Sequence, residues 1–172
     1  MSEVINAMLS RRSCRRYKAE PVPMEAVEQI VKAGTYAATG MGKQSPVIIA
    51  VTDKEVRDSL SRINAAVIGR DGDPFYGAPA VLVVLADKQF STYKYDGSLV
   101  MGNMMLAAHA LGLGSCWIHR AKETFETEEG RALLKRLGIE GDYEGIGNCI
   151  IGYSDNGEKS AAPRKENYVY YV

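Results

Sequence analysis

The 172-residue sequence has little cysteine, no surplus of charge and no long hydrophobic run. Its three cysteines, Cys14, Cys116 and Cys149, lie far apart and form no CxxC pair, so neither a disulfide framework nor a zinc site is expected, which fits a reducing cytoplasm. The 21 basic residues balance 21 acidic ones, which argues against a broad nucleic-acid-binding face. No apolar run reaches the ~18 residues of a membrane span, and no leader is expected. We therefore expect a cytoplasmic protein without metal, nucleic-acid or membrane partners.

No feature of the sequence divides it into parts. It contains no internal repeat, low-complexity tract or linker rich in proline, glycine or serine. A domain of this length buries about 70% of the surface that its unfolded chain exposes, which is enough for a core without covalent staples. We expect one domain over residues 1–172.

Hydrophobic periodicity predicts that helices alternate with strands along the chain. Helices are expected over residues 3–10, 54–63, 95–111 and 126–137, and a further helix is expected to begin at Pro23. Strands are expected over residues 47–51, 80–86 and 146–153, and residues 115–119 are expected to form a short strand or a turn. The strand at 80–86 is apolar on both faces, which is typical of the middle of a covered sheet. Alternation alone would suggest a doubly wound parallel sheet.

The helix expected over Tyr95–Leu111 contains VMGNMMLAAHALG and is apolar almost all round. A helix of that composition needs cover on every side. His109 lies within it and is expected to be a hydrogen-bonded core or interface residue.

The segment RRSCRRYK, residues 11–18, contains four arginines and a lysine in eight positions. Arginines just after a helix often complement its negative C-terminal end in solvent. However, Arg11, Ser13 and Arg15 alternate, so their side chains would project to one side of an extended chain. Two guanidiniums and a hydroxyl on one side suit a dianionic phosphate. A phosphate monoester ligand is the working hypothesis, with a solvated basic patch as the alternative.

The segment TGMGKQS, residues 39–45, looks at first like a nucleotide-binding P-loop. That motif requires a glycine where this chain has Ala37 and a serine or threonine where it has Gln44. The segment also follows an expected helix rather than a strand, so we reject this interpretation.

Several motifs follow one another along the chain: RRSCRRY, GMGKQSP, FYGAPAVLVVLAD, DGSLVMGNMMLAAHALGLGSCWI, a strand ending in GY, and a late APRK. Together they resemble the FMN-dependent nitroreductase family. The resemblance implies an α+β, nitroreductase-like fold in which helices flank a central, mostly antiparallel mixed sheet. It also implies an intertwined homodimer with FMN at the interface. The long apolar helix would then be covered at the dimer core, since obligate interfaces often bury more than about 2,000 Å².

The resemblance also implies which residues hold the cofactor. Those at the FMN phosphate and ribityl chain are Arg11, Arg12, Ser13, Arg15, Arg164 and Lys165. Many members carry a lysine where this chain has Ala162, and Lys165 is the expected substitute. Those beside the isoalloxazine ring are Lys43, Gln44, Ser45, Cys116, Trp117, Ile118 and His119. Lys43 is the expected cation near N1, and backbone amides of residues 116–120 are the expected donors near N5.

The activity implied is that of an FMN-dependent NAD(P)H oxidoreductase that reduces nitroaromatics, quinones or similar acceptors by ping-pong hydride transfer through flavin N5. No catalytic side chain is implied, because the flavin carries the chemistry. A Gly-x-Gly-x-x-Gly fingerprint is missing, which fits a transient NADH or NADPH donor. The alternatives are a non-catalytic FMN-binding protein, reductive dehalogenation and flavin fragmentation. Residues 64–77 are expected at the rim over the flavin.

Overall fold

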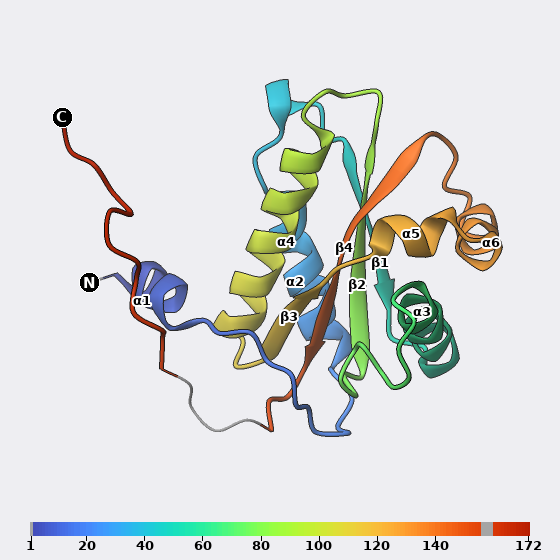
Figure 1. Ribbon diagram of the computed structural model, residues 1–172, viewed down its shortest axis with the longest axis horizontal. Coiled ribbons are helices and arrows are strands. Elements are labelled where there is room, and N and C mark those ends of the chain that lie inside the picture. The colour runs from blue at the N-terminus through green and yellow to red at the C-terminus, as the bar shows by residue number, and fades with distance from the viewer. Residues whose placement is uncertain (1, 156–159) are drawn as a thin grey trace.

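The centre of the protein is a four-stranded sheet with helices on both sides (Figure 1), seen in a computed structural model that describes residues 2–155 and 160–172. Its strands, in spatial order, are β1 (Pro46–Val51), β2 (Ala80–Asp87), β4 (Tyr143–Gly152) and β3 (Gly114–Ile118). Every neighbouring pair of these strands is antiparallel. The α+β fold implied by the family resemblance is confirmed, and the doubly wound parallel sheet suggested by alternation alone is wrong.

The helices form two layers. They are α1 (Glu3–Ser10), α2 (Met24–Thr35), α3 (Lys54–Val67), α4 (Tyr93–Ala110), α5 (Ala121–Glu126) and α6 (Glu128–Arg136), with a short 3-10 turn, η1, at Gly40–Gly42. In Figure 1, α2 and α4 lie against one face of the sheet, and α3, α5 and α6 lie toward the other. α1 lies at one side of the molecule and contacts α4.

The central strand β2 separates two hydrophobic cores. Its even positions, such as Leu82 and Val84, pack with α2 and α4, whereas its odd positions, such as Val81 and Val83, pack with α3 and α5. All four side chains are fully buried. The period of two along a strand explains this division, because successive side chains point to opposite faces. The prediction that residues 80–86 form a strand covered on both faces is confirmed.

Close packing between β4 and α5 requires a glycine at position 145. A Cβ there would lie 2.3 Å from the carbonyl carbon of Ala121, closer than any real contact permits. The register of β4 against β2 also shifts at Val84 and Leu85, opposite this part of the strand. The backbone at Ala121, which follows β3, therefore packs directly against β4 of the sheet.

Two predicted helices have different bounds in the structure. α3 runs to Val67 instead of ending at Ile63, so Asn64 is helical and buried rather than the first residue of a loop. The helix predicted over 126–137 is α6, which begins two residues later, at Glu128, and a short helix that was not predicted, α5, precedes it and ends before Thr127. The Thr127 hydroxyl accepts a hydrogen bond from the Gly130 amide at 3.1 Å and donates one to the Thr124 carbonyl at 2.7 Å, which ends one helix and begins the next.

α4 is not covered on every side within one chain. Met101 and Met104 are fully buried, but Tyr95 and Leu99 are 73% and 50% exposed. α1 has no buried residue, and its exposed side chains include Val4, Met8 and Leu9. None of the helices that the structure describes is long and apolar enough to cross a lipid bilayer.

Candidate functional site

The basic segment after α1 lies extended against the β3 edge of the sheet. Ser13 forms a parallel bridge with Ser115, and the Cys14 amide donates to the Ser115 carbonyl at 2.9 Å. Cys14 is buried, while Ser13 and Arg15 on either side of it are more exposed, as alternation along an extended chain requires. The Tyr17 hydroxyl donates to the Cys14 carbonyl at 2.9 Å. Burial raises the pKa of Tyr17, so this donor stays protonated.

Two arginines of this segment carry polar atoms that lack a partner. Arg11 Nη1 and Arg12 Nε are buried, and neither donates a hydrogen bond to an acceptor within residues 2–155 and 160–172. The other end of the Arg12 guanidinium is fixed, since its Nη1 donates to the Arg11 carbonyl at 2.6 Å. Buried donors are nearly always satisfied in native proteins, so this pair points to a missing acceptor.

The same region contains a cavity of about 570 Å³. Arg15 lines it from the basic segment, and residues 117–120 line it from the end of β3. Asn64 and the loop that follows α3 complete the wall, as far as Tyr76. The cavity therefore brings together Arg15, Trp117, Ile118 and His119 among the predicted site residues.

Two buried asparagines hold the end of β3. Asn64 Nδ2 donates to the His119 carbonyl at 2.8 Å, and Asn148 Nδ2 lies 3.4 Å from the same oxygen. Neither Asn64 Oδ1 nor Asn148 Oδ1 has a partner in the described part of the chain. Sequence reasoning placed Asn64 only at the start of the expected rim and did not mark Asn148. It missed the contacts of both, because a single asparagine within a helix or strand carries no signal of its contacts.

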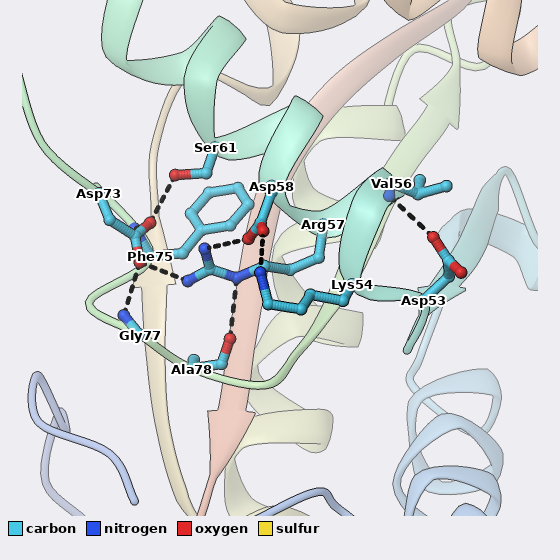
Figure 2. Close-up of polar contacts among 10 residues, drawn as sticks. All are labelled: Asp53, Lys54, Val56, Arg57, Asp58, Ser61, Asp73, Phe75, Gly77 and Ala78. Carbon is cyan, nitrogen blue, oxygen red and sulfur yellow. Dashed lines mark hydrogen bonds and ion pairs between the residues drawn. The ribbon is translucent and has the colours of Figure 1, made fainter. Parts of the chain in front are cut away.

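The loop between α3 and β2 is anchored by a buried arginine, as Figure 2 shows. Arg57 is 7% exposed; its Nε donates to the Ala78 carbonyl at 2.9 Å and its Nη2 to Asp73 Oδ2 at 2.5 Å. Asp73 also accepts from the Ser61 hydroxyl at 2.5 Å and from the Phe75 amide at 2.8 Å. These contacts fix the rim of the cavity to α3.

The surroundings of Asp73 favour its ionised form. Burial opposes ionisation, but the hydrogen bonds from Arg57, Ser61 and the amides of Gly77 and Phe75 together outweigh it, and the pKa of Asp73 is lowered. The carboxylate is thus charged near neutral pH and remains paired with the Arg57 guanidinium.

Comparison with known proteins identifies the fold and its relatives. The sequence profile of the nitroreductase family matches residues 8–71 and 70–153. The chain belongs to the nitroreductase family. It is 31% identical over 159 residues to a protein of Archaeoglobus fulgidus named "Putative NADH dehydrogenase/NAD(P)H nitroreductase", with 89% of this chain and 86% of that one covered. It is 28% identical to "FMN reductase [NAD(P)H]" of Bacillus subtilis, with 67% and 53% covered, so it spans about half of that relative.

Solved structures of nitroreductases resemble the whole chain. A nitroreductase with bound FMN from Bacteroides fragilis is 27% identical, and each chain is covered completely with a TM-score of 0.90. A nitroreductase with bound FMN from Desulfitobacterium hafniense is 25% identical, again with complete coverage and a TM-score of 0.88.

Three of the residues predicted beside the isoalloxazine ring do not line the cavity: Lys43, Gln44 and Ser45. Ser45 is buried, and its hydroxyl donates to Asp96 Oδ2 at 2.7 Å. Asp96 Oδ1 accepts from the Gly40 amide at 2.9 Å, so this carboxylate ties η1 to the start of α4. Lys43 and Gln44 are exposed.

The remaining predicted residues also differ in position. Arg164 and Lys165 lie in the exposed tail; Arg164 Nη2 donates to the Ala162 carbonyl at 2.6 Å, and Lys165 Nζ lies 5.4 Å from the centre of the Tyr168 ring. Cys116 is buried in the core on the α3 side of the sheet and does not line the cavity. A role for these side chains in this chain's own cavity stays a prediction.

The anchor at Asp73 leads to a pH-dependent prediction. Because its pKa is lowered from an ordinary value of about 3.9, the carboxylate stabilises the fold above that value, and its contribution is lost as the pH falls through the folded-state pKa. We expect Asp73→Asn to destabilise the protein at pH 7 and the difference from wild type to shrink below about pH 4. Urea unfolding between pH 7 and pH 3 measures this difference.

Asp71→Asn is the matched control, since Asp71 lies on the same loop and makes no hydrogen bond or ion pair with the described residues. If the free energy of unfolding of Asp73→Asn differs from that of wild type by the same amount over the whole pH range, the ionised Asp73 does not anchor the loop.

Proposed function

We propose that the protein is an FMN-dependent NAD(P)H oxidoreductase that reduces nitroaromatic, quinone or similar electron-poor acceptors. The observation that carries the proposal is the cavity of about 570 Å³ between the basic segment and the end of β3. The nitroreductases from Bacteroides fragilis and Desulfitobacterium hafniense, which match the chain over its full length, have bound FMN. The curated relatives named for NAD(P)H support the choice of electron donor.

The residues present fit the phosphate of FMN. The buried, unpartnered Arg11 Nη1 and Arg12 Nε require an acceptor, and a dianionic phosphate supplies several. Ser13 and Arg15 lie in the same extended segment, and Arg15 also lines the cavity. We assign these four residues to the phosphate and ribityl chain.

The residues of this chain bind and orient the flavin and shield it from water. Residues 117–120 form a wall whose backbone is held by Asn64, and the Arg57–Asp73 pair keeps the facing rim in place. FMN held in this cavity would supply the redox chemistry, which is hydride transfer from NADH or NADPH to the acceptor in a ping-pong cycle. The protein needs no acid or base of its own, and holding the partners at roughly 3–3.5 Å is its contribution.

The active form is a homodimer in this proposal. Exposed apolar side chains on α1, on α4 and in the tail, such as Leu9, Leu99 and Tyr170, supply a surface for a second copy. Lys43, Gln44, Arg164 and Lys165 lie outside the cavity of their own chain. In the dimer we assign them to the partner's flavin.

The phosphate assignment predicts loss of flavin on removal of two guanidiniums. Arg11→Ala combined with Arg15→Ala should weaken FMN binding by roughly 1.5–3 kcal/mol per charged hydrogen bond removed. Equilibrium dialysis against FMN, followed by flavin absorbance, measures the dissociation constant.

Arg16→Ala is the control, because Arg16 belongs to the same segment but forms an ion pair with Asp155 at 3.3 Å on the surface. Equal weakening by Arg16→Ala and by the double substitution would mean that only general positive charge matters, which contradicts a specific phosphate site.

The dimer proposal predicts the effect of a charge on α4. Leu99→Glu should separate the subunits, because burying a carboxylate without a partner costs several kcal/mol. Sedimentation velocity should give twice the mass of one chain for wild type and the mass of a single chain for the variant, with flavin lost as well. A wild-type protein that sediments as a single chain while retaining flavin would contradict the proposal.

The activity is tested by steady-state kinetics. NADH or NADPH oxidation should accelerate on addition of a nitroaromatic or quinone, and double-reciprocal plots at several acceptor concentrations should be parallel, as a ping-pong cycle requires. A non-catalytic flavin-binding protein would show no acceptor-dependent oxidation, and intersecting lines would exclude the ping-pong order.

A further inference from the structure

Arg120 has an unusual backbone conformation at the wall of the cavity. Its φ of 73° and ψ of 21° lie in the left-handed region, which favours glycine. A non-glycine residue in this region is retained where the surroundings fix it, commonly at functional sites. The conformation raises the question of what the Arg120 side chain contributes.

The structure around Arg120 fixes the turn from both sides. The preceding carbonyl, that of His119, accepts from the buried Asn64 amide at 2.8 Å, and the following residue, Ala121, is fully buried. The turn is therefore held by its neighbours and not by contacts of the Arg120 side chain. Glycine would suit the backbone better, so the guanidinium is the feature that arginine adds.

The cavity carries positive charge beyond the phosphate site. Arg70 and Arg120 both line it, and neither side chain forms a hydrogen bond or ion pair with any residue that the structure describes. Of the carboxylates lining the cavity, Asp73 is already paired with Arg57, which leaves Asp71. The free guanidiniums therefore outnumber the free carboxylates at this wall.

We propose that Arg70 and Arg120 bind an anionic group, a carboxylate or a phosphate, on the molecule that enters the cavity to exchange electrons. This inference rests on the proposed function. It narrows the substrates to molecules that carry a negative charge near the group that exchanges electrons, which is the electron-poor group of an acceptor or the nicotinamide of a donor. A planar guanidinium can hydrogen-bond two oxygens of such a group at once. The anion belongs either to the acceptor or to the nucleotide donor, and two measurements separate them.

The first measurement compares two probes of similar shape, 4-nitrobenzoate and 4-nitrobenzamide, of which only the first is charged. Trp117 lines the cavity and is the only tryptophan of the chain, so quenching of its fluorescence in the oxidised, flavin-loaded protein reports binding without turnover. In Arg120→Asn, we expect affinity for 4-nitrobenzoate relative to 4-nitrobenzamide to fall about 5- to 10-fold. Asparagine is chosen because it tolerates the left-handed conformation.

The second measurement compares NADH with 1-benzyl-1,4-dihydronicotinamide, a neutral hydride donor without phosphate, at a fixed concentration of a neutral quinone. If the anion belongs to the nucleotide, Arg120→Asn lowers kcat/KM for NADH relative to the neutral donor, while the ratio of the two nitro probes is unchanged. Ratios are used in both measurements because any general loss of activity or flavin cancels in them.

Three variants serve as controls. Arg120→Lys keeps the charge and should retain most of the selectivity, and Arg70→Gln should reproduce the loss in part. Arg131→Gln removes an exposed arginine on α6, outside the cavity, and should change neither ratio.

A fall in either ratio supports the proposal and identifies the source of the anion. If Arg120→Asn and Arg70→Gln leave both ratios unchanged, the proposal is wrong. Failure of the proposed function is seen separately, as a protein that oxidises neither nucleotide, while the probe binding ratio still reports on the two arginines.

Discussion

The wall of the cavity depends on one shared hydrogen-bond acceptor, the carbonyl oxygen of His119. Amides from Asn64 on α3 and Asn148 on β4 converge on it, at 2.8 Å and 3.4 Å. Both asparagines are buried, so releasing the carbonyl would leave polar groups without partners in a dry interior, at about 1–3 kcal/mol each. Because the contacts join a helix, a strand and the turn at Arg120, they fix the wall of the cavity to the sheet behind it and to the helix that begins its rim.

Much of the fold was predictable from the period of the apolar residues. The bounds predicted for residues 3–10 agree with α1, and the buried strand at 80–86 agrees with β2 within one residue. The direction of the strands was not predictable from alternation, since the antiparallel order β1-β2-β4-β3 is set by long-range pairing; it followed only from the family resemblance. The helix predicted over 126–137 agrees with α6 within two residues, whereas α5 was missed because its six residues are too few to show a helical period.

The candidate site was predictable where several residues act together in one segment. Alternation in RRSCRRYK indicated an extended basic segment, and the structure pairs it with β3 at Ser13. The Arg57–Asp73 anchor was not predictable, because its partners come from a helix and a loop 16 residues apart with no motif between them. Lys43 and Arg164 differ from these residues. The family resemblance marks them as cofactor ligands, yet they do not line the cavity of their own chain, and the proposed dimer is what would bring them to a flavin.

In the proposed function, this cavity holds a flavin that passes electrons from a nicotinamide nucleotide to an electron-poor acceptor. The most direct test is the absorption spectrum of the purified protein under anaerobic conditions, before and after NADH or NADPH, with the released chromophore identified by mass. The account predicts a yellow protein that carries FMN, bleaches with the nucleotide and regains its colour when a quinone or nitroaromatic is added. A protein that is colourless and takes up no added FMN, or an FMN complex that stays yellow with both nucleotides, would contradict it.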